Sequence, residues 1–366
     1  MPARPRGQAG GPRPRRRTRA WIRLVLVNAA VFAAVLVVAE GAARWLAPRD
    51  LSGVFGDPQT FLRNRPYIVP HPQRGFALRP GYAEGELHIN AAGLRGPELP
   101  AAFEGRPIVL AVGESSTFGW RVGDLDTYPA RLQHLLDRVP RHVPPLVLNA
   151  GVPSYTSPQV LAYLHELLPR YRPRVVLVTV LWNDALFACL PHWMPDYLVH
   201  QQPLGWRRFL LRHSGVYRAL AIRPEPVGRV ESVHNERALN LYADNLAAMA
   251  RDCRDGGAQL VFVRPSMDPA HIPAEGMKIG PRIVPPPAFA ALLAEFAATL
   301  DQVAKRAGVP LLGHRLDAGD PAMSRFFIDP VHPNGDGNEV IAEAVAAYLS
   351  DVAFPAEGLA SGGKQP

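Results

Sequence analysis

The sequence has few cysteines and no GxGxxG motif. These two absences argue against a zinc or redox site and against a dinucleotide site. Cys189 and Cys253 are the only cysteines among the 366 residues, and they lack the CxxC spacing that is typical of zinc and redox sites. No GxGxxG stretch follows the first predicted strand, so a dinucleotide site is not indicated either. We therefore expect no metal and no cofactor, and the sequence leaves open whether the two thiols pair.

Negative charge is missing from the start of the chain, and this absence explains the net charge of +8. Residues 1–23 contain eight arginines and no acidic residue. Subtracting these eight from the 40 basic residues leaves 32, which equals the number of acidic residues. A short basic tail beside an apolar run is typical of a membrane protein, so we expect no nucleic-acid partner.

An uncharged run follows this basic arm. Residues 24–39 have no charged side chain, and Trp21, Ile22, Trp45 and Leu46 extend the apolar stretch. Sixteen residues of helix measure about 24 Å, so these flanking residues are needed to approach a hydrocarbon core of about 30 Å. We predict a transmembrane signal-anchor over residues 24–46. The arginines keep the arm of residues 1–23 in the cytoplasm, so the rest of the chain lies outside the cytoplasmic membrane.

A cleaved signal peptide is the alternative interpretation of this run. Its small residues would be Ala39, Gly41, Ala42 and Ala43, which are suited to a cleavage site. Both interpretations place the remaining chain outside the cytoplasm. The abundance of alanine, arginine and proline suggests a bacterial gene.

The remaining chain divides by its hydrophobic pattern. Residues 47–106 form an irregular preamble, residues 107–352 form the main domain, and residues 353–366 form a flexible tail. In the main domain short apolar runs alternate with amphipathic helices, which predicts a parallel sheet of about five strands with helices on both faces. The predicted strands cover residues 108–112, 146–149, 175–181, 259–263 and 310–312; the predicted helices cover residues 127–138, 158–168, 236–254, 287–306 and 337–350.

Two long, proline-containing segments interrupt this alternation, at residues 185–235 and 265–286. Because loops of this length in a compact domain are usually functional, we predict that both are lids or walls of the substrate site. His192, His200 and His213 lie in the first segment, but their spacing matches no familiar set of metal ligands.

Chemically competent side chains follow the predicted strands, where a parallel sheet places its ligand site. Ser115 follows the first strand in the stretch Gly113 to Gly119, on a turn whose amides favour a developing negative charge. Gly151 follows the second strand and can bring its N–H close to a ligand. Asn183 follows the third strand and carries a neutral amide donor.

An aspartate and a histidine stand three residues apart before the last predicted helix. One short turn can present both Asp329 and His332, and the carboxylate can then hold the imidazole in the tautomer that a general base needs. Each of these features alone is common. Three of them follow strands and the fourth precedes the last helix, and this arrangement indicates a hydrolase with a serine nucleophile.

The set resembles the SGNH/GDSL family of esterases and lipases, in its membrane-anchored bacterial type, over roughly residues 107–350. The four family blocks are matched by Gly113-Glu114-Ser115, Asn149-Ala150-Gly151, Asn183-Asp184 and Asp329 to His332. The resemblance implies a flavodoxin-like three-layer α/β/α sandwich. It also implies that Ser115 is the nucleophile, that His332 is its base and that Asp329 orients this base. Ser115, Gly151 and Asn183 would form the oxyanion hole.

The chain departs from the family pattern at two positions. Glu114 stands where the family usually has Asp, which we interpret as neutral for the attack, and Leu181 replaces a glycine of many members. In the preamble, residues 88–100 are similar to a lead-in of membrane-anchored members, for which we expect a surface role. An α/β-hydrolase would need GxSxG, but Thr117 occupies the position of its second glycine.

These observations predict an ester hydrolase whose substrate is an acylated carbohydrate or another ester of the cell envelope. Two alternatives remain. The same site can transfer the acyl group to an envelope glycan instead of water, as an O-acyltransferase. A catalytically silent, membrane-tethered carbohydrate-binding protein is the third hypothesis.

Overall fold

The structure, a computed structural model, describes residues 15–46, 65–101, 105–190, 193, 206–221, 228–279, 282–317 and 320–354. It contains two compact units. The N-terminal unit comprises Met1–Asp50 and Leu204–Pro224, and the large unit comprises Leu51–Pro203 and Glu225–Pro366. Parts of the predicted basic arm (1–14), of the preamble (47–64) and of the tail (355–366), together with His192 and His200, lie outside the described residues.

A five-stranded parallel sheet forms the centre of the large unit. Its strands lie in the order β12-β9-β7-β5-β6, and each neighbouring pair is parallel. Numbered by their sequence, the strands run 2-1-3-4-5 from one edge to the other, which is the flavodoxin-like order. The fold prediction is confirmed. The strands are β5 (Ile108–Gly113), β6 (Leu146–Gly151), β7 (Val175–Thr179), β9 (Gln259–Val263) and β12 (Leu311–Leu312).

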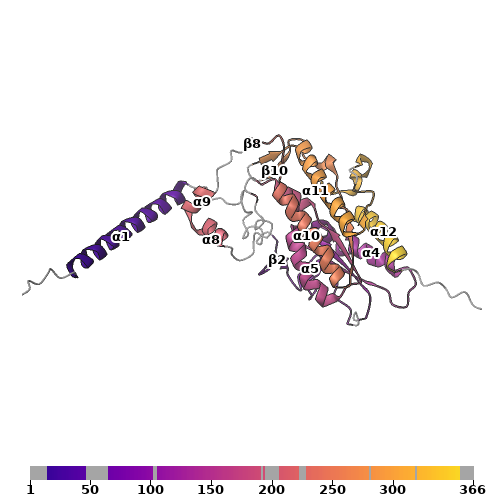
Figure 1. Cartoon of the computed structure of the whole chain (residues 1–366). Helices are drawn as coiled ribbons and strands as arrows, with labels where there is room; N and C mark the ends of the chain where they lie inside the picture. Colours follow the sequence, from indigo (N-terminus) through magenta and orange to yellow (C-terminus); the bar gives the residue numbers. More distant parts are fainter. Residues whose placement is uncertain are drawn as a thin grey trace, which may run out of the picture. The chain divides into compact units, whose positions relative to one another are not determined.

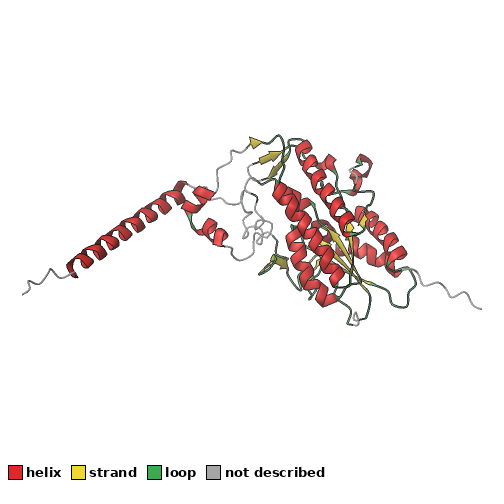
Figure 2. Cartoon of the chain, viewed as in Figure 1, coloured by secondary structure: helices red, strands yellow, loops and turns green. Residues whose placement is uncertain are grey.

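Helices cover both faces of this sheet (Figures 1 and 2). The side chains of β5 alternate between two apolar cores: Leu110 and Val112 face one of them, and Val109 and Ala111 face the other. The first core includes α5 (Ser157–Tyr171), α10 (Glu236–Asp255) and α11 (Pro286–Ala307). The second includes α4 (Tyr128–Asp137) and α12 (Gly335–Val352). A strand buried on both faces needs a continuous apolar run, which β5 and β7 have.

The described part of the preamble adds two small hairpins to the large unit. These are β1 (Ile68–His71) with β2 (Gly75–Leu78), and β3 (Ala83–Glu84) with β4 (Leu87–His88). Arg74 fixes the first hairpin, because its buried guanidinium binds Glu166 at 2.9 and 3.0 Å and donates to the Tyr155 hydroxyl at 2.8 Å.

The two predicted insertions meet in a third small sheet. Strand β8 (Gly228–Arg229) comes from the first insertion and pairs with β11 (Arg282–Val284) of the second, which also pairs with β10 (Met277–Ile279). The first insertion begins with a helix, α6 (Trp182–Ala188), that continues directly from the end of β7. Cys189 and Cys253 are buried free thiols.

One part of the first insertion contacts α1 (Arg15–Leu46). Helices α8 (Trp206–His213) and α9 (Gly215–Ala221) belong to the N-terminal unit, where α9 packs on α1. Hydrogen bonds join the start of α9 to α1. The expected role of this insertion as a lid or a wall of the substrate site stays a prediction.

Helix α1 is long and apolar. Its segment Trp21–Trp45 has the length and composition of a membrane-crossing helix, features that a signal sequence near the N-terminus shares. At 1.5 Å per residue, its 25 residues extend over about 37 Å, which exceeds a hydrocarbon core of about 30 Å. The helix starts at Arg15, inside the predicted basic arm.

Candidate active site

Ser115 lies directly beyond the carboxyl end of β5, an inner strand of the sheet. Strand β5 ends at Gly113, and the one-turn helix α3 (Ser115–Phe118) begins two residues later. Only glycine fits at position 113, because a Cβ there would collide with the carbonyl oxygen of Thr179 on β7 and with the Thr117 side chain. This close approach sets the turn that presents Ser115. The N–H of Ser115 has no acceptor among the residues that the structure describes.

Asp329 shapes the loop that carries His332. Its Oδ1 accepts the backbone N–H of Val331 at 3.1 Å and that of His332 at 3.0 Å. Aspartate commonly closes turns in this way. Asn334 then caps α12 by accepting the N–H of Gly337 at 3.0 Å. The local sequence therefore places the carboxylate and the imidazole on one rigid turn.

Ser115, His332 and Asp329 form a continuous hydrogen-bonded chain. His332 Nε2 lies 2.7 Å from Ser115 Oγ, and His332 Nδ1 lies 2.7 Å from both carboxylate oxygens of Asp329. Burial disfavours the charged form of Asp329, but the hydrogen bonds and charge of His332 outweigh it and hold the pKa of Asp329 below its usual value. The arrangement can move a proton from the serine to the imidazole and stabilise the resulting cation.

The second insertion is hydrogen-bonded to the turn that carries Asp329 and His332. The N–H of Asp268 donates to the carbonyl of Pro330 at 2.8 Å, between the two residues of the pair. The indole of Trp120 also lies near this turn, with its ring centroid 6.2 Å from that of His332. We predicted a substrate wall in residues 265–286. The observed contact shows that the start of this segment packs on the loop that carries Asp329 and His332.

Glu114 connects the turn that carries Ser115 to Asn183. Its buried carboxylate accepts three backbone N–H groups at the start of α6, from Leu181 at 3.2 Å, Trp182 at 3.1 Å and Asn183 at 3.1 Å. These are amides that a helix leaves without partners at its N-terminus. From the sequence we expected that Glu114, in place of the usual Asp, would not affect the attack on the substrate. The structure shows instead that its side chain fixes the helix that carries Asn183 relative to Ser115.

A second carboxyl group, that of Asp184, is also buried and interacts electrostatically with Glu114. It accepts the N–H of Ser157 at 2.9 Å and the Ser157 hydroxyl at 2.6 Å, and Asn245 donates to that hydroxyl oxygen at 3.0 Å. Burial and the neighbouring charge of Asp184 raise the pKa of Glu114 to about 8, against the opposing effect of its three N–H donors. Burial raises the pKa of Asp184 to about 7.

The expected role of Gly151 needs correction. Its single N–H, which we expected in the oxyanion hole, donates to the side-chain oxygen of Asn149 at 3.0 Å. Any Cβ at position 151 would collide with the backbone of Thr117 and Phe118. Gly151 therefore allows β6 to pack against the turn that carries Ser115, and its N–H is already donated to Asn149.

Ser154 is a residue that the sequence did not reveal. It adopts φ of 68°, a left-handed conformation that is uncommon for residues other than glycine, and its N–H has no acceptor among the described residues. The next residue, Tyr155, accepts a hydrogen bond from Asn183 Nδ2 at 2.9 Å. The strained peptide thus lies beside the Asn183 amide. A serine in the sequence does not indicate a left-handed backbone conformation, so no sequence signal identified Ser154.

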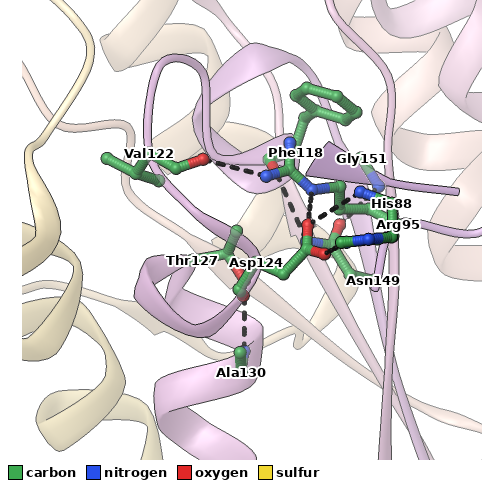
Figure 3. Close-up of polar contacts among 9 residues, drawn as sticks. All are labelled: His88, Arg95, Phe118, Val122, Asp124, Thr127, Ala130, Asn149 and Gly151. Atoms are coloured by element: carbon green, nitrogen blue, oxygen red, sulfur yellow. Dashed lines mark hydrogen bonds and ion pairs between the residues drawn. The ribbon is translucent and has the colours of Figure 1, made fainter. Parts of the chain in front are cut away.

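Arg95 of the preamble joins the end of β6 to the loop that follows α3 (Figure 3). Its N–H donates to Asn149 O at 3.0 Å, and its guanidinium lies 4.5 Å from the ring centre of Phe118. The guanidinium also binds Asp124 at 2.5 Å, and Asp124 contacts His88 Nδ1 at 2.6 Å. We expected only a surface role for residues 88–100. Arg95 is instead buried against β6 and α3.

The two buried carboxylates make stability depend on pH. Because their folded-state pKa values of about 8 and about 7 lie above their ordinary values, their contribution is present at low pH and is lost as the pH rises through this range. We expect the free energy of unfolding of the full chain to fall between pH 5 and pH 8, by about 1.4 kcal/mol per pH unit for each extra proton held. Urea unfolding over this range measures the slope.

Glu114→Gln has no proton to release, so we expect it to flatten this slope whatever its effect on overall stability. Glu231→Gln, at an exposed position, is the matched control and should leave the slope unchanged. An equally steep slope in Glu114→Gln would show that Glu114 does not titrate in this range.

Comparisons with known proteins identify a family for this chain. Residues 111–340 match the model of the GDSL-like lipase/acylhydrolase family. Similar solved structures include TesA (18% identity, TM-score 0.43, covering 67% of this chain and 98% of that one). The psychrotrophic esterase EstA from Pseudoalteromonas sp. has 15% identity and a TM-score of 0.43, covering 67% and 97% of the two chains.

A catalytic mutant of Axe2, an acetylxylan esterase from Geobacillus stearothermophilus, has 17% identity and a TM-score of 0.44, covering 68% and 94% of the two chains. A search of curated proteins gives no match. The assignment depends on the family model, which matches more than half of the residues. The chain belongs to the GDSL-like lipase/acylhydrolase family.

Proposed function

We propose that this chain is a serine esterase in which Ser115 attacks the ester carbonyl, His332 is the general base and Asp329 orients it. The observation that carries the proposal is the hydrogen-bonded chain from Asp329 through His332 to Ser115, with both links at 2.7 Å. It lies beyond the carboxyl end of β5, where parallel sheets of this type bind ligands. Family membership makes ester hydrolysis the expected chemistry.

The reaction follows from the positions of these atoms. Ser115 Oγ forms a bond with the carbonyl carbon while His332 Nε2 takes the hydroxyl proton, and the carbonyl π-electrons move to the oxygen. When this oxyanion collapses, the carbon–alkoxide bond breaks and His332 gives its proton to the leaving alcohol. Water then attacks the acyl-enzyme through the same base, which releases the acid and restores Ser115.

Three donors would stabilise the oxyanion. They are the N–H of Ser115, the N–H of Ser154 and the second hydrogen of the Asn183 amide, whose first hydrogen goes to Tyr155 O. Ser154 replaces Gly151 in this set because the Gly151 amide is occupied. Glu114 is a positioning residue in this scheme, since it holds the N-terminus of α6 and thereby Asn183.

The natural ester would belong to the cell envelope, with an acylated carbohydrate as the substrate class that we propose. The support is the topology: the eight arginines of residues 1–23 keep the N-terminus inside and leave the large unit outside. Product analysis tests both the class and the acceptor. Free acid released from an acetylated polysaccharide indicates hydrolysis, and an acylated sugar product would indicate the O-acyltransferase alternative.

Helix α1 would be a retained anchor rather than a cleaved signal peptide. The Glu40 carboxylate accepts the N–H groups of Gly215 at 2.5 Å and Val216 at 3.2 Å, and the Ser214 hydroxyl at 2.8 Å. Cleavage after Ala43 would remove Glu40 and leave these donors without their acceptor. The contacts therefore support the anchor over the signal peptide.

The retained anchor predicts an intact N-terminal helix in the mature protein. We expect the chain extracted from cell membranes to have the mass of the uncleaved sequence, apart from processing of the initiator methionine. Intact-protein mass spectrometry measures this. A mass corresponding to a chain that starts between residues 40 and 44 would refute the anchor.

Substitution of Ser115 tests the nucleophile. We expect Ser115→Ala to reduce kcat on nitrophenyl esters by at least about 10³-fold, and Asn183→Ala to reduce it by about 10²–10³-fold. Ser116→Ala is the matched control, because Ser116 is the adjacent serine and is buried; it should remain active. A fluorophosphonate probe should label the wild type and not Ser115→Ala.

Full activity of Ser115→Ala, or labelling of another serine, would contradict the proposal. A wild type that binds glycan but neither turns over esters nor reacts with the probe would establish the silent binding protein instead.

Backbone esters separate the two candidate amides. Replacing residue 154 by the corresponding α-hydroxy acid removes its N–H without a change of side chain. We expect this substitution to lower kcat by about 10²–10³-fold. The same replacement at residue 151 removes only the bond to Asn149, so it should lower stability and leave kcat nearly unchanged. The opposite pattern would return the oxyanion role to Gly151. Steady-state kinetics and thermal unfolding of both variants measure this.

A further inference from the structure

Two short helices of the first insertion are fastened to the last turns of α1. The Glu40 carboxylate accepts hydrogen bonds from three consecutive residues, Ser214, Gly215 and Val216, at the start of α9. Arg44, one turn further along α1, donates to the carbonyl of His213 at 2.6 Å and pairs with Glu40 at 2.7 Å. Figure 1 shows α8 and α9 at this end of α1.

Close packing of the two backbones fixes the position along α1 at which α9 begins. A Cβ at Gly215 would lie 2.7 Å from the N atom of Arg44 and 3.0 Å from the carbonyl carbon of Ala43, so α9 begins directly on the backbone of α1. The apolar segment of α1 ends at Trp45. The junction between α8 and α9 therefore lies level with the last turns of the apolar segment.

Large apolar side chains of these helices face solvent. The exposed fractions are 68% for Trp206, 51% for Phe209 and 78% for Leu220, and Trp45 on α1 is 78% exposed. Trp206 and Phe209 are three residues apart and thus on one side of α8. The sequence of α8 also holds three arginines, at positions 207, 208 and 212.

We propose that α8 and α9 lie in the outer interface of the membrane that α1 crosses, with Trp206 and Phe209 inserted at the boundary between headgroups and acyl chains. The proposal rests on α1 being a retained anchor. The occupant of the apolar face is the lipid of that same bilayer, because hydrogen bonds join this face to the end of the membrane-crossing helix. Aromatic side chains concentrate at membrane interfaces, and arginine suits lipid phosphates.

This placement changes how the large unit is held. Its chain connects to the N-terminal unit at three points, after residue 46, before residue 206 and after residue 221. A single anchor helix would provide only the first of these connections. With α8 and α9 in the interface, the connections before residue 206 and after residue 221 also lead from the membrane surface to the large unit.

Depth-dependent fluorescence quenching tests the placement on the full chain. The chain is reconstituted in vesicles of phosphatidylcholine and phosphatidylglycerol that carry nitroxides either near the headgroup or near the end of the acyl chain. An environment-sensitive fluorophore is attached to a single new cysteine at position 206 or 209, with Cys189 and Cys253 changed to alanine. Val31→Cys in the middle of α1 and Val143→Cys on the large unit are the controls.

We expect labels at 206 and 209 to shift to the blue and to lose most fluorescence to the shallow nitroxide, with less loss to the deep one. Position 31 should show the reverse order, and position 143 should lose little to either. Labels at 206 and 209 that behave like position 143, while position 31 is quenched, would overturn this proposal and leave the anchor standing. An unquenched position 31 would overturn the anchor itself. Self-quenching between labelled copies without lipid quenching would assign the face to a second copy of the chain and refute the lipid assignment.

Discussion

The carboxylate of Glu114 is the constraint on which the site depends. Glu114 lies between the end of β5 and Ser115, and its carboxyl group accepts the three N–H groups at the start of α6. The proposed nucleophile and Asn183 therefore move as one body, although 68 residues separate them in the sequence. Without this acceptor the helix start would be buried with unpaired amides, at a cost of about 1–3 kcal/mol for each group. The same burial gives Glu114 its raised pKa.

Much of this architecture could be predicted from the sequence, for reasons that are local. The apolar run of β5 and the alternation of strands and helices set the sheet, and the spacing of Asp329 and His332 set a turn that the structure confirms as one unit. The placement of Ser115, Gly151 and Asn183 at one edge followed from the ends of parallel strands, and the pairing of Ser115 with His332 came from the family resemblance. The sheet and the turn needed only the chemistry of neighbouring residues and the topology of a parallel sheet.

What the sequence could not predict depends on backbone conformation and on distant partners. The choice between Gly151 and Ser154 is decided by which N–H is already donated and by a left-handed φ at a serine, and neither is visible in residue types. The burial of Arg95 depends on Asp124 and on Asn149, 54 residues later. The packing of residues 206–221 on α1 depends on Glu40, which hydrophobic pattern alone marks only as the end of an apolar run.

These distant contacts share one physical device. Glu114 receives the free N–H groups of α6, Asp184 receives that of Ser157 at the start of α5, and Glu40 receives those of α9. In each case a carboxyl group from another segment accepts N–H groups at the start of a helix. On α5 and α9 it adds to a local cap, from Thr156 with Gln159 and from Ser214. Local capping needs a residue immediately before the helix and can be read from sequence. Remote capping instead uses a carboxyl group of one element to fix the start of another, and so positions two segments that are distant in the sequence.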